Sequence, residues 1–128
     1  MALAFVASSA NVLPPTAITI SGFIQGSPGR YAIQVSLWDA RGFLRNPVQV
    51  LHFAAGAGPR YRFVTSPGRW VVSAFEDHAG NGVLEMGIFG PKEPSGFWRS
   101  FSGWHKPRFD ELATDCEKSV DDADISLK

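Results

Sequence analysis

Three side chains with oxygen ligands follow one another in a glycine-rich stretch of the chain. Asp77, Asn81 and Glu85 stand four residues apart, with Gly80 and Gly82 between them. A hard cation such as Ca²⁺ takes several oxygen ligands, and glycine lets a loop curl around it. The spacing therefore predicts a candidate calcium loop, with Asp77, Asn81 and Glu85 as the ligands.

The same stretch departs from the spacing of an EF-hand. Ala79 stands at the third position of such a loop, and Ile88 stands at the twelfth, where a bidentate glutamate belongs. An Asn-Gly turn, in which Asp77 accepts hydrogen bonds from backbone amides, accounts for the same residues. This turn is the alternative that the composition favours.

The chain lacks the short motifs of common catalytic and nucleotide-binding sites. It has no Gly-x-Ser-x-Gly elbow, no His-Glu-x-x-His, no P-loop and no dinucleotide fingerprint. Its three histidines, His52, His78 and His105, could form a metal site only by meeting Asp77 in space. Ordinary surface or hydrogen-bonded histidines are the favoured alternative.

Glycoside hydrolysis would need two carboxylates at a defined separation. Glu76, Asp77, Glu85 and Glu93 could supply such a pair, but the sequence sets no distance between them. We therefore expect a non-catalytic chain. A carboxylate- or metal-dependent hydrolase acting on glycans is the alternative.

A long stretch from Glu76 to Asp110 is rich in glycine and proline and shows little periodicity. Loops of this length inside a compact domain are usually functional or disordered, and aromatic residues favour an ordered loop. Trp98, Phe101 and Trp104 are typical of platforms that stack on sugars or anchor a partner protein. The alternative, equally open, is that these three rings fold back and plug one end of the domain.

The bulk composition limits the class of protein. The chain has 128 residues, 45% of them hydrophobic and 12% aromatic, which is enough for one domain with a packed core. Cys116 is the only cysteine, so the chain can form no intrachain disulfide and no thiolate metal cluster. Ten basic and five acidic residues precede Phe109, and two basic and seven acidic residues follow it. The basic residues are scattered, so we expect no nucleic-acid partner.

Several segments alternate with the period of two that is typical of half-buried strands. The expected strands cover residues 17–24, 30–38, 48–54, 61–65, 69–75 and a closing run at 123–127. The first two are separated by a Gly/Pro turn and are expected to pair as a hairpin. Their predicted inward residues are Ile18, Ile20, Ile24, Tyr31, Ile33, Val35 and Leu37.

Three further segments carry specific expectations. Residues 48–54 are apolar at both parities, which predicts a strand that is covered on both faces or bulged. Residues 69–75 are expected to form the central strand. Residues 110–118 fit a short helix and a strand equally well.

About seven short strands with turns between them indicate an all-β, antiparallel β-sandwich, with residues 16–128 as a single domain. Residues 1–15 are expected to be a leader or the remnant of a secretory signal. They are apolar and then small, although they lack a basic start and are too short to span a bilayer. No later stretch is long and apolar enough to be transmembrane.

Four motifs follow in order along the chain: GRWVVSAFED (68–77), GNGVLE (80–85), GPKEPSGF (90–97) and PRFD (107–110). This succession resembles a bacterial, usually exported family, number 2141 among the domains of unknown function. The resemblance implies an immunoglobulin-like or prealbumin-like sandwich with no established activity. It also implies that Phe97 and Phe109, which belong to the family pattern, are buried. The chain departs from the pattern at Ala79, at Glu85 and at Trp98.

These observations predict a non-catalytic binding or assembly module that is periplasmic or secreted, with Ca²⁺ as the candidate stabilising ion. Its expected partner is an unknown protein or glycan that contacts Trp98, Phe101 and Trp104. An accessory structural subunit of a larger complex is the alternative. Such a subunit would be joined to its neighbours through an edge strand or through the acidic segment after Arg108.

Overall fold

The computed structural model describes residues 16–27, 29–56, 60–78, 80–82, 86–87, 90–91, 93–101 and 105–128. The predicted leader at 1–15 lies outside the described residues, as do Glu85 and Trp104. The elements in chain order are β1 (Ile18–Gln25), β2 (Ala32–Trp38), β3 (Gln49–Phe53), β4 (Arg60–Thr65), β5 (Gly68–Asp77), β6 (Met86–Gly87), β7 (Gly90–Pro91), β8 (Ser95–Phe97), α1 (Phe109–Leu112), β9 (Thr114–Cys116) and β10 (Ile125–Ser126).

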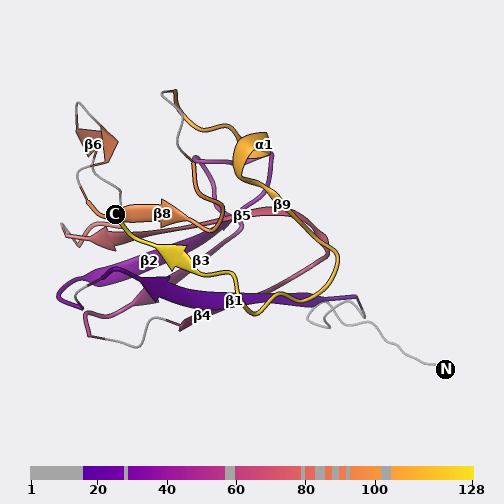
Figure 1. The fold of residues 1–128 in the computed structure, drawn as a ribbon, viewed down its shortest axis with the longest axis horizontal. Coiled ribbons are helices and arrows are strands. Elements are labelled where there is room, and N and C mark those ends of the chain that lie inside the picture. The colour runs from indigo at the N-terminus through magenta and orange to yellow at the C-terminus, as the bar shows by residue number, and fades with distance from the viewer. Residues whose placement is uncertain are drawn as a thin grey trace.

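The strands form two main sheets that pack face to face. One sheet has the order β10-β1-β4, and the other has the order β3-β2-β5-β8, with β9 also paired to β5. Figure 1 shows β1 and β4 in one layer and β5 and β8 in the other, with α1 beyond the larger sheet. The predicted β-rich, sandwich-like architecture is confirmed, and β5 is the central strand, as expected.

The core lies between the two sheets and is built from the alternating faces that the sequence predicts. The fully or almost fully buried side chains there include Ile18, Ile20, Ile24, Ile33, Val35, Leu37, Tyr61, Phe63, Val72 and Ile125. Each large apolar side chain that is removed from water in this way contributes about 1.5–3 kcal/mol. A second, smaller cluster of Val71, Leu112 and Ala113 is joined by partly buried aromatic residues, among them Phe97 and Phe109.

The hairpin expected between residues 17–24 and 30–38 is wrong. β1 pairs with β4 and β10, whereas β2 pairs with β3 and β5, so the turn between them crosses from one sheet to the other. Period-two alternation indicates which face of a strand is buried, but it does not indicate the neighbouring strand. Tyr31 was expected to face inward. It lies before β2, is 39% exposed and stacks on His78 instead.

For two other segments the sequence left more than one form open. β3 is an edge strand whose only partner among the described strands is β2. Its residues are half-buried, except His52, which is exposed, so neither face is fully covered. Residues 110–118 satisfy both alternatives in turn, because α1 ends at Leu112 and β9 begins at Thr114. A single periodic assignment over this segment could not represent both elements.

The segment of residues 119–128, called here the closing segment, confirms the predicted alternation near the end of the chain. Ala123, Ile125 and Leu127 are buried, whereas Asp124 and Ser126 are exposed. β10 runs parallel to β1, which departs from the expected all-antiparallel pairing. The Tyr61 hydroxyl donates a hydrogen bond of 2.5 Å to the Ala123 carbonyl oxygen, and burial raises the pKa of Tyr61 far above its usual value.

Candidate functional site

The loop after β5 has the geometry of a turn capped by Asp77. One carboxylate oxygen of Asp77 accepts the backbone N–H of Asn81 at 3.3 Å, and the other accepts that of Gly82 at 2.6 Å. Gly80 and Gly82 have φ angles of 69° and 72°, in the left-handed region that glycine adopts without strain. These contacts are the ones that the Asn-Gly turn alternative requires.

The predicted calcium ligands are brought together only in part. Asp77 and Asn81 share the turn, whereas Glu85 lies outside the described residues. The described residues contain no group of three His, Cys, Asp or Glu side chains that could hold a metal ion. The oxygen atoms of Asp77 are already engaged by two backbone amides, so a cation at this loop would have to share them.

A buried carboxylate lies immediately before the turn. Glu76 is 2% exposed and accepts a hydrogen bond of 2.6 Å from the Ser27 hydroxyl through Oε2. Its Oε1 lies 3.0 Å from Nε2 of His78. Glu76 belongs to the face of β5 that also carries Trp70, Val72 and Ala74, so strand geometry directs its carboxylate toward the interior.

A second buried carboxylate contacts the backbone of His78. Glu93 is 4% exposed, and its Oε2 accepts the backbone N–H of His78 at 2.5 Å. The backbone N–H of Glu76 donates to the Pro94 carbonyl oxygen at 2.9 Å, which places β5 beside the segment leading into β8. The His78 ring stacks on Tyr31, with 3.8 Å between the ring centroids. We call Ser27, Tyr31, Glu76, His78 and Glu93 the polar cluster.

The bonding within the polar cluster limits its chemistry. In a nucleophilic triad the serine hydroxyl donates to an imidazole, which a carboxylate orients. Here the Ser27 hydroxyl donates to the carboxylate of Glu76, and His78 contacts the other oxygen of that carboxylate. Among the described contacts, Ser27 therefore meets a carboxylate and no imidazole, which is not the arrangement of a Ser-His-Asp triad.

The three histidines do not form a common site in the described structure. His78 belongs to the polar cluster, His52 lies on the edge strand β3, and Nε2 of His105 lies 2.9 Å from a carboxylate oxygen of Glu111. Glu111 also accepts the backbone N–H of Arg108 at 2.8 Å, and this hydrogen bond, followed by the contact with His105, lowers the pKa of Glu111. His105 and Glu111 therefore serve the start of α1.

Two of the three predicted binding aromatics are described, and both are half-buried. Trp98 packs against the main core, and its backbone N–H donates to the Val72 carbonyl oxygen at 2.9 Å. Phe101 packs against the second cluster and meets the His105 ring edge to face, at 5.4 Å between centroids. These contacts resemble those of the plug alternative, but neither residue is fully buried.

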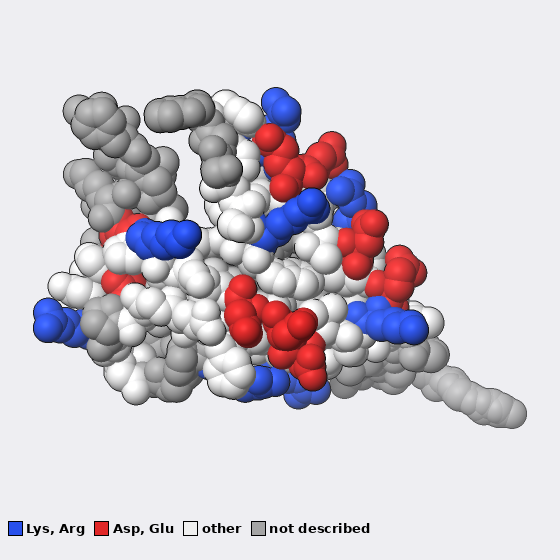
Figure 2. All heavy atoms as spheres, in the orientation of Figure 1, with Lys and Arg blue, Asp and Glu red and all other residues white. Residues whose placement is uncertain are grey.

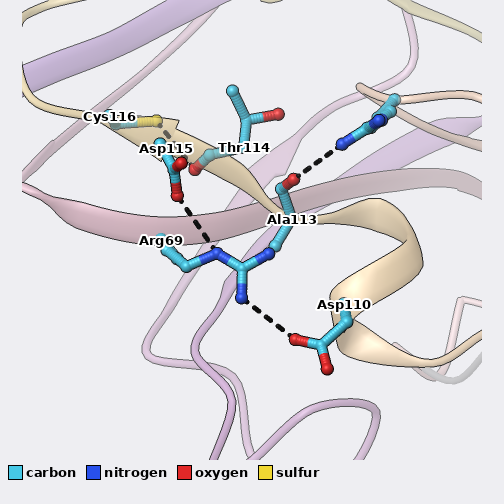
Figure 3. A network of polar contacts seen from close by, with 7 residues as sticks. Arg69, Asp110, Ala113, Thr114, Asp115 and Cys116 are labelled. Atoms are coloured by element: carbon cyan, nitrogen blue, oxygen red, sulfur yellow. Dashed lines mark hydrogen bonds and ion pairs between the residues drawn. The ribbon is translucent and has the colours of Figure 1, made fainter.

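A surface network fastens α1 and β9 to β5. Arg69 reaches Asp110 on α1 at 3.0 Å and Asp115 on β9 at 3.1 Å, as Figure 3 shows. Arg99 donates a hydrogen bond of 3.1 Å to the Ala113 carbonyl oxygen between these two elements. The Arg69 side chain is about half exposed, and those of Asp110 and Asp115 are mostly exposed. Each ion pair therefore contributes at most about 1 kcal/mol.

The acidic residues that follow Arg108 gather on one side of the molecule. Figure 2 shows most acidic side chains of the visible face over α1, β9 and the segment that leads to β10. Asp121, Asp122 and Asp124 are exposed there. Lys and Arg side chains stand among these acidic side chains on the same face.

Among the described residues, no helix has the length and apolar character needed to cross a membrane. No family model matches the chain, and neither does any curated protein or any solved structure. The fold and the side-chain contacts are therefore the basis for a functional proposal.

Proposed function

We propose that this chain is a non-catalytic binding or assembly module that acts outside the cytoplasm. The observation that carries the proposal is the bonding of the polar cluster, in which the groups suited to acid–base or nucleophilic chemistry are tied to partners inside the fold. Glu76 and Glu93 are almost fully buried, so neither carboxylate can contact a polysaccharide without rearrangement. The extracytoplasmic location rests on the resemblance to an exported family and on the apolar composition of residues 1–15, which is the basis of the predicted leader.

The proposed contact surface is the aromatic arm, defined as residues Trp98, Phe101 and Trp104. Aromatic rings stack on the apolar faces of sugars and also anchor protein partners. Phe101 and Trp98 are fixed by the core on one side, so little conformational entropy would be lost on binding. We choose a glycan as the first ligand class to test.

The test measures retention of the purified chain on insoluble peptidoglycan and on chitin. We expect retention to fall for Phe101→Ala and Trp104→Ala. It should persist for Phe23→Ala, a matched control that removes a 46% exposed phenylalanine from β1. Melting curves of each variant separate lost binding from lost folding.

The same samples test the alternative of a glycan hydrolase. We expect no release of reducing ends from either polysaccharide. Release that disappears in Glu93→Gln would favour the hydrolase over the binding module. Equal retention of all three variants would remove the aromatic arm from the proposal.

Calcium binding at the Asp77 turn is a separate proposal with a stability readout. A site with an affinity of about 0.1 mM would stabilise the fold by about 1.4 kcal/mol in about 1 mM Ca²⁺. The melting temperature should then rise between chelator and calcium, and this rise should be absent in Asp77→Ala. Identical melting curves of the unmodified chain in both buffers would leave Asp77 as a turn cap only.

A further inference from the structure

The edge of β1 that faces away from β4 is completed by the closing segment, which lies about a hundred positions later in the chain. In addition to the pairing of β1 with β10, four backbone hydrogen bonds of 2.8–3.0 Å join the two: Val120 N to Thr19 O, Ser21 N to Val120 O, Ala123 N to Ser21 O, and Leu127 N to Gln25 O. Side chains of the closing segment add three more, one of which is a hydrogen bond of 3.4 Å that the Ser126 hydroxyl donates to Gln25 Oε1. Ser119 Oγ accepts the Thr19 N–H at 2.9 Å, and Asp124 Oδ1 accepts the Phe23 N–H at 2.8 Å.

The closing segment also reaches the other sheet. The backbone groups of Lys128 and Ser95 exchange two hydrogen bonds, of 3.2 and 3.3 Å. In Figure 1 the yellow end of the ribbon runs between β1 and β8. The segment therefore closes the gap between the two sheets along one side of the sandwich.

Three glycines, called here the glycine floor, line this gap and leave room for the backbone of the closing segment. A Cβ atom at Gly22 would lie 2.2 Å from the Ala123 carbonyl oxygen, and one at Gly96 would lie 2.3 Å from that of Ser126. A Cβ atom at Gly26 would lie 2.6 Å from the Leu127 carbonyl oxygen. Only residues without a side chain permit so close an approach.

The closing segment carries its own share of the core. Ala123 and Ile125 are 0% exposed, Leu127 is also buried, and all three belong to the main cluster. The link to β9 is short and polar, and its residues Glu117 and Lys118 are exposed. The closing segment thus supplies its own hydrogen bonds and its own buried side chains. The exposed link, called here the hinge, connects it to β9.

We propose that the edge of β1, with the glycine floor, is a strand-acceptor site that also receives the closing segment of a second copy of this chain. The contacts that hold the segment depend on its sequence and not on which copy supplies it. Reciprocal exchange between two copies would rebuild the same hydrogen bonds and the same core in a closed dimer. The partner is a second copy because the closing segment fits this edge: Ser119 and Asp124 accept backbone N–H groups of β1, and the backbone of Ala123 lies against Gly22.

This inference deepens the assembly half of the proposed function and rests on it. It uses none of the residues of the aromatic arm. Failure of strand exchange would therefore leave the glycan test unchanged, and failure of glycan retention would leave the exchange test unchanged.

The test uses two full-length variants, Gln25→Cys and Ser126→Cys, each also carrying Cys116→Ala so that the native cysteine cannot cross-link. Positions 25 and 126 are register partners between β1 and β10, and both side chains are exposed, so neither new cysteine disturbs the core. The Gln25→Cys chain carries an added N-terminal tag, so that mixed and self cross-links differ in mass. The two variants are unfolded, refolded together at rising protein concentration, oxidised and separated on a non-reducing gel.

We expect a mixed disulfide whose share rises with the protein concentration during refolding. It should be far weaker when the variants are refolded separately and then mixed, because exchange requires the closing segment to leave its own core. Lys118→Cys in place of Ser126→Cys is the matched control, since this exposed hinge residue has no register partner on β1. A mixed disulfide no stronger than in this control would overturn the proposal.

A second measurement keeps the proposal testable if a cysteine variant fails to fold. The unmodified chain is refolded at low and at high concentration, and its mass is measured by light scattering after equal dilution. We expect a species of twice the chain mass that persists only after refolding at high concentration. A single-chain mass under every condition would reject the exchange.

Discussion

Replacing Gly22 by alanine is expected to lower the free energy of unfolding by about 3 kcal/mol, the upper end of the usual cost of overpacking, because the clash is with backbone atoms. The new Cβ atom would lie 2.2 Å from the Ala123 carbonyl oxygen and 2.3 Å from its carbonyl carbon. The closing segment would have to move away from β1. That movement would weaken the backbone bonds of Ser21 and the hydrogen bond from the Tyr61 hydroxyl.

Urea unfolding at neutral pH measures this effect, with Gly56→Ala as the control. A Cβ atom at Gly56 meets no other atom within 4 Å, but its φ of 81° makes alanine costly by about 1 kcal/mol. The Gly22 variant should lose clearly more stability than the control, although its backbone has no positive φ. A loss equal to or below that of Gly56→Ala would show that the closing segment adapts without cost.

Replacing Glu76 by alanine is expected to cost about 2–4 kcal/mol, because it leaves two polar partners unpaired and a cavity behind. The half-buried Ser27 hydroxyl would lose its acceptor, and Nε2 of His78, whose side chain is 35% exposed, would lose its partner. The turn at Asp77 follows directly, so the loop should also become more susceptible to proteolysis. Urea unfolding gives the stability, and limited proteolysis reports the local effect.

Two further variants separate the effect of the lost carboxylate of Glu76 from the effect of the lost side-chain volume. Glu76→Gln keeps the size of the side chain and one oxygen that can accept from Ser27, so its loss should be smaller than that of Glu76→Ala. Asp115→Ala removes an exposed carboxylate that is paired with Arg69 and should change stability by at most about 1 kcal/mol. Equal losses for all three variants would contradict a special role of the buried carboxylate.

The sequence predicted the faces of the strands well, because burial follows a period of two. Ile33, Val35 and Leu37 are buried on one face of β2, as their alternation indicates. Strand partners could not be predicted in the same way. β1 lies between β4 and β10, and its contacts with the closing segment join residues 99 to 102 positions apart. No local pattern encodes such pairing.

The candidate site was predictable at the turn and not beyond it. Asp77 and Asn81 are close in sequence, so the capped turn follows from local chemistry. The polar cluster depends on Ser27, which lies 49 positions before Glu76. One sequence signal was available, because Glu76 continues the alternating series Trp70, Val72 and Ala74 on the buried face of β5. A carboxylate at such a position requires a buried partner, but the sequence does not say which one.

The late pairing of β1 has a consequence for synthesis. Ribosomes make the chain from the N-terminus, so β1 emerges about a hundred residues before the strand that covers its second edge. Until then the nascent chain exposes unpaired amides and carbonyls beside three isoleucines that are buried in the finished fold. Such intermediates aggregate readily. Holdase chaperones that bind extended apolar segments should therefore raise the yield of the folded protein during expression.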